Sequence, residues 1–304
     1  MRVKLNRQQI YILFLLAFSC GLIFLTVHSW RKNFQMAPLE ISYLDVGQGD
    51  AILINYLHRY QILIDGGPSE KKVLTELGRV MPNFDNKIEV VIITHPDRDH
   101  FTGLLGVLRK YKIGAVLHNG QRSVDPLWRE LTTMVQKRQI IWQTIGEGST
   151  LEIGKSFVSE VFKKKKISEQ PIKIKIFNPD KISTSQKIKN SSSVVARLDY
   201  GENSFLFTGD IDFDGESDMI FDQEDIDVDW LKVSHHGSKY SSSDFFLARV
   251  SPQTAIISVG KNDYGHPSTE TLNRLKKIGA KILRTDQLGT IKIICRDEKC
   301  YEVQ

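Results

Sequence analysis

The densest group of potential metal ligands in the chain lies in one short segment, Thr94–His100. Two imidazoles and two carboxylates fall within six residues of it: His95, Asp97, Asp99 and His100. The apolar run Val90–Ile93 comes directly before and is typical of a buried strand, so a tight turn could aim these side chains at one point. Imidazole nitrogens and carboxylate oxygens hold Zn²⁺ or Mn²⁺ in proteins. A solvated acidic turn is the plain alternative.

Further acids and histidines follow other predicted strands, where a sheet delivers side chains to a common edge. Each has a structural alternative on its own. Asp65 and Asp210 adjoin glycines and could be turn residues, and His266 in Gly-His-Pro could cap a turn. Their repeated occurrence after predicted strands is unlikely to be a coincidence, so we take them together as candidates for one site: Asp65, His95, Asp97, Asp99, His100, Asp210, His235, His236 and His266.

The elements that must position these residues alternate along the chain. Strands are predicted at 39–46, 51–56, 61–65, 90–93, 113–118, 194–200, 204–207, 228–233 and 254–259, and helices at 71–80, 103–111, 126–137, 242–250 and 269–278. Alternating apolar residues predict further strands between Leu151 and Phe177, and two strands close the chain. Two halves rich in strands and helices predict an α/β fold with four layers: helix, sheet, sheet, helix.

The N-terminal region is expected to anchor the chain in a membrane. The nineteen residues Ile10–His28 are almost all apolar and carry no formal charge. At about 1.5 Å per residue they reach roughly 28 Å, close to the thickness of a bilayer core. Basic residues before the run slightly favour a cytoplasmic N-terminus. A cleavable signal peptide is the alternative, but the run is long for one and lacks an Ala-x-Ala site.

These features predict four parts for the chain. Residues 1–9 form a short cytoplasmic tail, 10–28 a single-pass signal anchor, 29–38 a linker, and 39–304 an extracellular domain. Of the 304 residues, 41% are hydrophobic and 25% charged, which excludes a disordered chain, and the net charge of +5 slightly favours anionic partners. Cys295 and Cys300 could form a disulfide if the closing strands pair; two free thiols are the alternative.

Eight segments between Leu39 and about Ile294 form a specific set. They read LDVGQGDAILI, LIDGG, THPDRDHFTGL, SSSVVARLDYG, FLFTGDI, LKVSHHGSKYS, GHPS and RTDQLGTIKI. Together they resemble the metallo-β-lactamase fold hydrolases, and in particular the extracellular hydrolase domain of ComEC-type competence proteins. The resemblance implies a four-layer αββα sandwich, two divalent metal ions and hydrolase chemistry.

The resemblance also implies roles for single residues. The wider family carries His-x-His-x-Asp-His, whereas Asp97 stands here at the second histidine, as in the ComEC-like branch. By likeness, His95 and Asp97 help to hold one metal, Asp99 and His100 hold the second, and Asp210 bridges both. The added carboxylate moves the expected preference from Zn²⁺ towards Mn²⁺.

The last ligand is open among three histidines. His235 is favoured, while His236 and His266 are expected as ligand, proton donor or phosphate contact, and Asp65 is expected to orient a ligand histidine. The family's third histidine is absent, and Lys189–Ser193 occupies its region. Three residues near the paired histidines could contact phosphate: Ser238, Lys239 and Tyr240.

The expected function is a metal-dependent phosphodiesterase at the cell membrane, in particular a nuclease acting on extracellular DNA. Two bridged metals lower the pKa of a shared water, and the resulting hydroxide can attack phosphorus in line. One apolar span cannot form a pore, so DNA uptake would need a separate channel. Two alternatives stay open: a phosphoesterase for wall polymers, phosphocholine or small phosphodiesters, and a non-catalytic module that binds DNA or a partner.

The DNA expectation depends on the segment Lys155–Lys189, which contains ten lysines. Such charge suits a nucleic-acid groove. The alternative is a solvated edge hairpin that the lysines keep unpaired.

Overall fold

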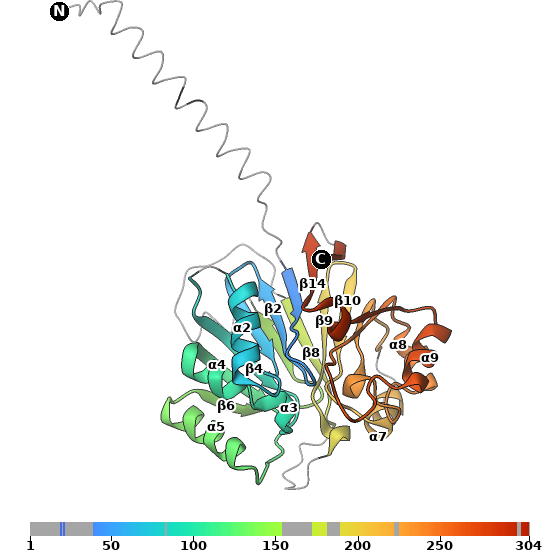
Figure 1. The fold of residues 1–304 in the computed structure, drawn as a ribbon, viewed down its shortest axis with the longest axis horizontal. Coiled ribbons are helices and arrows are strands. Elements are labelled where there is room, and N and C mark those ends of the chain that lie inside the picture. Colours follow the sequence, from blue (N-terminus) through green and yellow to red (C-terminus); the bar gives the residue numbers. More distant parts are fainter. Residues whose placement is uncertain are drawn as a thin grey trace, which may run out of the picture. The chain divides into compact units, whose positions relative to one another are not determined.

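The computed structural model describes residues 19, 21, 39–82, 84–153, 172–180, 189–221, 225–296 and 299–303. By their contacts the residues divide into two units, Met1–Ala37 and Pro38–Gln304, and the second holds the fold shown in Figure 1. The predicted span Ile10–His28 lies outside the described residues, apart from Ser19 and Gly21. Within the described part of the chain, no helix has the length and apolarity to cross a bilayer.

Two sheets form the middle of the second unit. The first has eight strands in the order β15-β14-β1-β2-β3-β4-β5-β6, and the second has seven in the order β13-β12-β11-β10-β9-β8-β7. The strands of the first are β1 (Leu39–Tyr43), β2 (Ile52–Tyr56), β3 (Tyr60–Ile64), β4 (Lys87–Ile93), β5 (Lys112–His118), β6 (Ile141–Thr144), β14 (Ile291–Arg296) and β15 (Lys299–Val303). Those of the second are β7 (Thr150–Ile153), β8 (Ile172–Asn178), β9 (Val195–Tyr200), β10 (Asn203–Phe207), β11 (Trp230–Lys232), β12 (Thr254–Ile257) and β13 (Lys281–Arg284).

Helices cover the outer face of each sheet (Figure 1). The first sheet carries α2 (Glu70–Val80), α4 (Leu104–Lys110) and α5 (Pro126–Lys137), and the second carries α7 (Phe213–Phe221), α8 (Asp244–Val250) and α9 (Thr269–Lys277). The described residues also form four shorter helical turns: α3 (Arg98–Phe101), α10 (Thr285–Leu288), η1 (Asn190–Ser192) and η2 (Ser234–Gly237). Serine hydroxyls accept hydrogen bonds from first-turn amides of α2, α8 and α9, which fixes where these helices begin.

Three apolar layers hold these parts together. β4 illustrates the arrangement, because Val90 and Ile92 pack between the two sheets while Val91 and Ile93 pack against the helices. A strand that is covered on both faces needs a continuous apolar run, which is the pattern seen in the sequence. Between the sheets, the ring centroids of Tyr43 and Phe207 lie 6.3 Å apart. The predicted four-layer α/β sandwich is confirmed.

Several elements differ from the predictions. β6, α7 and β13 were not predicted: β6 and β13 have only four residues each, and α7 contains glycine and three acids. The two closing strands pair as β14 and β15, and Cys295 lies opposite Cys300 and is bonded to it. Most of the lysine-rich segment, including Lys163–Lys166, lies outside the described residues.

Candidate metal centre

The candidate residues meet at one edge of the sandwich because parallel strands of both sheets end there. β3, β4 and β5 run parallel in the first sheet, and β10 and β11 run parallel in the second. The segment after β4 lies beside the start of β9, where the Val194 amide donates to the Thr94 carbonyl oxygen (3.0 Å). The turns after β10 and β11 also touch, since the His235 amide donates to the Gly209 carbonyl oxygen (3.2 Å).

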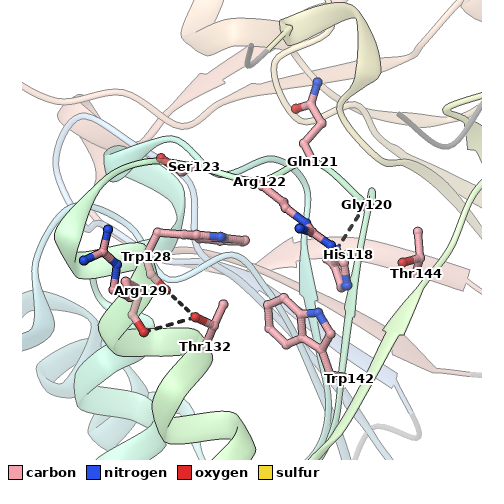
Figure 2. Close-up of a pocket in the computed structure, with 10 residues that line it drawn as sticks. All are labelled: His118, Gly120, Gln121, Arg122, Ser123, Trp128, Arg129, Thr132, Trp142 and Thr144. Carbon is pink, nitrogen blue, oxygen red and sulfur yellow. Dashed lines mark hydrogen bonds between the residues drawn. The ribbon is translucent and has the colours of Figure 1, made fainter. Parts of the chain in front are cut away.

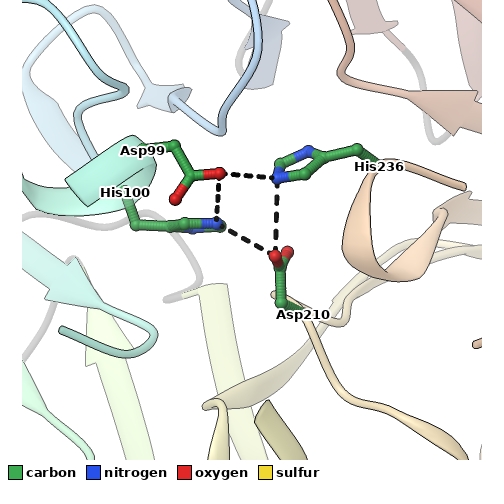
Figure 3. A group of neighbouring side chains, drawn as sticks. All are labelled: Asp99, His100, Asp210 and His236. Atoms are coloured by element: carbon green, nitrogen blue, oxygen red, sulfur yellow. Dashed lines mark ion pairs between the residues drawn. The ribbon is translucent and has the colours of Figure 1, made fainter. Parts of the chain in front are cut away.

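Four side chains converge at this edge: Asp99, His100, Asp210 and His236 (Figure 3). One ligand atom from each lies within 4.8 Å of the others. The Nε2 atoms of His100 and His236 lie 3.3 and 3.4 Å from Oδ2 of Asp210. Asp99 Oδ2 is 3.4 Å from His236 Nε2 and 4.0 Å from His100 Nε2. Two nitrogens and two carboxylates therefore face one point.

The opposite ring nitrogens fix the orientation of both imidazoles. His100 Nδ1 lies 2.8 Å from Asp65 Oδ2, and His236 Nδ1 lies 2.9 Å from the Ser258 carbonyl oxygen. Both partners are acceptors, so each Nδ1 carries a hydrogen, and in the neutral ring each Nε2 presents a lone pair. Asp65 is itself held by the amide and hydroxyl of Thr94, at 2.8 and 2.6 Å.

A divalent cation fits this arrangement of lone pairs. Both Nε2 atoms and Asp210 Oδ1 are buried without a hydrogen-bond partner among the described residues. Burial lowers the pKa of His100, but the charges of Asp210, Asp65 and Asp99 outweigh it and raise the pKa well above its usual value. Burial likewise raises the pKa of Asp210, yet His236 and His100 hold it well below its usual range. The negative charge of the carboxylates thus favours a cation at the point where the two imidazole rings face them.

A second ligand pair adjoins the first group. His95 Nε2 lies 3.4 Å from Asp97 Oδ2, and the ring centroids of His95 and His100 are 4.2 Å apart. His95 is fully buried, and its Nε2 has no hydrogen-bond partner in the described chain. The Asp97 side chain is 39% exposed and so can approach a ligand from the open side. His95 and Asp97 are therefore two further potential ligands beside the four-residue group.

The three candidate histidines for the last ligand occupy different places. His236 belongs to the four-residue group, whereas His235, which the sequence favoured, lies outside it with its Nε2 3.8 Å from Asp210 Oδ2. His266 stacks edge-on against His235 at 5.4 Å between centroids. Burial lowers the pKa of His266 to about 4. His235 and His236 have φ angles of 50° and 53°, a left-handed turn that directs adjacent side chains to different places.

Residues 44–261 match the model of the metallo-beta-lactamase superfamily. The chain belongs to this superfamily. It is similar to ComE operon protein 3 of Bacillus subtilis, with 31% identity over 83% of this chain and 32% of that protein. It is also similar to Recombination protein 2 of Haemophilus influenzae, with 27% identity over 86% of this chain and 29% of that protein. The chain spans about a third of the length of these curated relatives.

A solved structure agrees on the fold. A variant of the CmlA beta-hydroxylase superposes with a TM-score of 0.52 at 12% identity, over 84% of this chain and 54% of that one. The metallo-beta-lactamase fold supports metal-dependent hydrolysis, and the relatives are competence proteins of the ComEC type. The expected resemblance is therefore confirmed.

The region that lacks the superfamily's third histidine supports the centre in another way. The Ser193 hydroxyl accepts a hydrogen bond from the Asp210 amide (3.3 Å). Asn178 donates to the carbonyl oxygens of Ser193 and Ser191, at 2.6 and 2.8 Å. The side-chain nitrogen Nδ2 of Asn190 lies 3.4 Å from His235 Nδ1. This segment thus positions Asp210 and His235 through hydrogen bonds.

Sequence reasoning missed two charged residues of this metallo-beta-lactamase centre, Asp50 and Lys232. Lys232 is fully buried, forms an ion pair with Asp50 and donates to the Gly209 carbonyl oxygen (3.0 Å). Its Nζ also lies 3.7 Å from Asp210 Oδ1. Burial lowers the pKa of Lys232, but Asp50 and Asp210 outweigh it and raise the pKa above its usual value. Lys232 is therefore a fixed positive charge next to the candidate ligand Asp210.

Asp50 reaches the centre through a glycine turn. At Gly49, φ is +141°, and an added Cβ would collide with the Asp99 carbonyl oxygen. The Asp50 amide donates to this same oxygen (3.3 Å), so the turn holds the segment that bears Asp99. The sequence signal was the Gly-Gln-Gly-Asp turn between two predicted strands.

The predicted substrate-facing residues line a separate opening. Ser238, Lys239 and Tyr240 border a cavity of about 530 Å³ together with His235 and His266. The Lys239 ammonium lies 5.0 Å from the centroid of the Tyr240 ring. Tyr240 is exposed, so this cavity can admit a substrate from solvent.

Proposed function

We propose that the chain is a phosphodiesterase that cleaves DNA with the help of two divalent metal ions, Mn²⁺ or Zn²⁺. The observation that carries the proposal is the convergence of the Nε2 atoms of His100 and His236 on the carboxylates of Asp99 and Asp210. Such a pair of ions, when bound, lowers the pKa of a water and neutralises charge on the phosphate oxygens. His95, Asp97, Asp99, His100, Asp210 and His236 would hold them.

The chain's own residues prepare the site for that chemistry. Asp65 and the Ser258 carbonyl oxygen keep the two imidazoles in the tautomer that presents Nε2. Lys232 offsets part of the negative charge of the buried acids. Burial holds His266 neutral, and the residue lies at the cavity beside the centre, where its ring can accept a proton from the attacking water. Lys239 supplies positive charge there for a phosphate.

DNA is proposed as the substrate because the names of the relatives refer to competence and recombination. A location outside the cell membrane also belongs to the proposal. The apolar run Ile10–His28 has the length to span a bilayer, and the Cys295–Cys300 disulfide suits an oxidising compartment. A separate uptake channel would be the partner.

The proposal is tested with the full-length protein after all metal has been removed. Single-stranded DNA, double-stranded DNA and bis-(p-nitrophenyl) phosphate are each incubated with Mn²⁺, Mg²⁺ or Zn²⁺. The control is the double variant Asp99→Ala, His100→Ala. Metal-dependent cleavage of DNA that disappears in the control supports the nuclease. Cleavage of the small diester alone moves the substrate to wall polymers or small phosphodiesters, and binding of metal with no cleavage favours a binding module.

A further inference from the structure

A second cavity, shown in Figure 2, is lined by none of the candidate metal ligands. Its volume is about 650 Å³, which is within the range of small-molecule sites. It lies between the ends of β5 and β6 and the helix α5. The residues that the argument uses are His118, Arg122, Trp128, Arg129 and Trp142.

His118 offers this cavity a hydrogen-bond donor that has no partner. The residue is 6% exposed, and its Nδ1 accepts a hydrogen bond from the Gly120 amide (3.0 Å). The hydrogen of the neutral ring is therefore on Nε2, which is buried with no hydrogen-bond partner among the described residues. Burial lowers the pKa of His118 to about 4, so the ring is neutral near pH 7. An acceptor atom on a ligand would satisfy this donor.

Aromatic rings form the walls around this donor. The ring centroids of His118 and Trp142 are 4.3 Å apart, and those of Trp128 and Trp142 are 5.9 Å apart in an edge-to-face arrangement. Trp128 is buried, whereas Trp142 is half-buried and keeps part of its surface open. A half-covered indole beside an unpartnered donor suits a flat heterocycle that carries acceptor atoms.

Positive charge lies at the mouth of the cavity. Arg122 and Arg129 are both exposed and line it, while none of the described lining residues is acidic. This combination disfavours a cationic ligand such as a quaternary ammonium group. It favours a planar ring that is attached to an anion, and a nucleotide has both parts.

The cavity adjoins the metal centre along the same sheet edge. His118 is paired with Ile93, and the metal-ligand segment begins directly after Ile93. The turn after His118 is bonded to the segment that supports Asp210, since Asn119 donates to the Ser192 carbonyl oxygen (2.9 Å). A strand of DNA that crosses this edge can therefore reach both places.

We propose that this cavity is a nucleotide subsite that takes one unstacked base of single-stranded DNA against Trp142, with its phosphate near Arg122 and Arg129. The inference rests on the proposed phosphodiesterase, because a neighbouring phosphate of the same strand would then lie at the metal centre. A base in a duplex is stacked and paired, so the subsite selects single strands or frayed ends.

The test measures binding rather than turnover. The full-length protein is titrated into fluorescein-labelled oligo(dT) in EDTA, and the fluorescence anisotropy of the label gives the dissociation constant. We expect Trp142→Leu to weaken binding roughly 5- to 150-fold, the range for loss of one base–aromatic stack. Arg122→Ala should reduce the slope of log K against log salt by about 0.7, the value for one phosphate contact on a single strand. The matched control is Tyr301→Leu, an aromatic residue that is 44% exposed on β15, at the other edge of the same sheet.

The outcomes separate this inference from the proposed function. If Trp142→Leu binds oligo(dT) as the parent does, or if the parent binds duplex as tightly as single strand, the subsite is refuted even where DNA is cleaved. The subsite is also refuted if the parent protein does not bind oligo(dT). If binding depends on Trp142 but no diester is hydrolysed, the subsite stands and the phosphodiesterase fails. Hydrolysis of bis-(p-nitrophenyl) phosphate by Trp142→Leu at the parent rate shows that the metal centre is intact.

Discussion

Replacing Lys232 with methionine is expected to destabilise the protein strongly. The Lys232 side chain is 1% exposed and the Asp50 side chain is 2% exposed, so water cannot replace the lost ammonium group. Methionine keeps most of the side-chain length but removes the cation that lies nearest to the buried Asp50 carboxylate. Removing one partner of a buried ion pair costs about 3–5 kcal/mol. At roughly 2–4 °C per kcal/mol for a domain of this size, the midpoint of thermal unfolding should fall by roughly 6–20 °C.

The assay is urea and thermal unfolding of Lys232→Met beside the parent, both in EDTA. The control is the double variant Asp50→Asn, Lys232→Met, in which the buried carboxylate is also removed. We expect the double variant to recover at least about 1 kcal/mol relative to Lys232→Met, because residues in direct contact couple by about 0.5–3 kcal/mol. A single variant that unfolds within about 1 kcal/mol of the parent would refute the reasoning, since Lys232 would then not be compensating a buried charge.

Three further predictions concern the metal, the pH and the disulfide. Mn²⁺ at 100 times its dissociation constant should stabilise the parent by about 2.7 kcal/mol. Asp210→Asn should lose most of this stabilisation, measured by thermal shift, and most of the hydrolysis, measured with the diester assay. Burial lowers the pKa of His118 from 6.5 to about 4, so between these pH values the unfolded chain binds a proton that the folded chain does not. The contribution of His118 to the free energy of unfolding is therefore complete above pH 6.5 and falls by about 3 kcal/mol at pH 4. Urea titrations of His118→Gln should lack this part of the loss of stability in acid. The variant Cys295→Ala, Cys300→Ala should lose about 2 kcal/mol of unfolding free energy, the value for a short loop. It should keep the parent's rate of hydrolysis, because β1 pairs with Cys295 at the end of the strand that is remote from the centre. A lower rate of hydrolysis would contradict this prediction.

The position of the centre could be predicted because it depends on local patterns. The apolar run Val90–Ile93 marks a strand that is buried on both faces, and the acids and histidines follow it directly. The carboxyl ends of parallel strands meet at one edge, so residues after β4, β10 and β11 come together whatever the details of the loops. The fold class follows from the same alternation of strands and helices.

The remaining parts of the centre depend on contacts between distant segments. Lys232 sits on the strand face that packs between the sheets, whereas a lysine in an alternating strand is usually solvent-exposed. Only the folded chain shows that Asp50 compensates its charge. The choice between His235 and His236 depends on two successive left-handed residues, and although histidine is enriched in that conformation, it remains uncommon and is not identified from the sequence.

The origin of the four converging side chains has a consequence for how the protein can be monitored. Asp99 and His100 follow a strand of the eight-stranded sheet, while Asp210 and His236 follow strands of the seven-stranded sheet. Neither sheet carries all four side chains, so the ligand geometry exists only while the inner faces of the two sheets pack against each other. Partial separation of the sheets would abolish metal affinity before either sheet lost its own hydrogen bonds. A measurement of metal affinity therefore reports on the packing of the two sheets against each other, and it responds to their separation before the secondary structure changes.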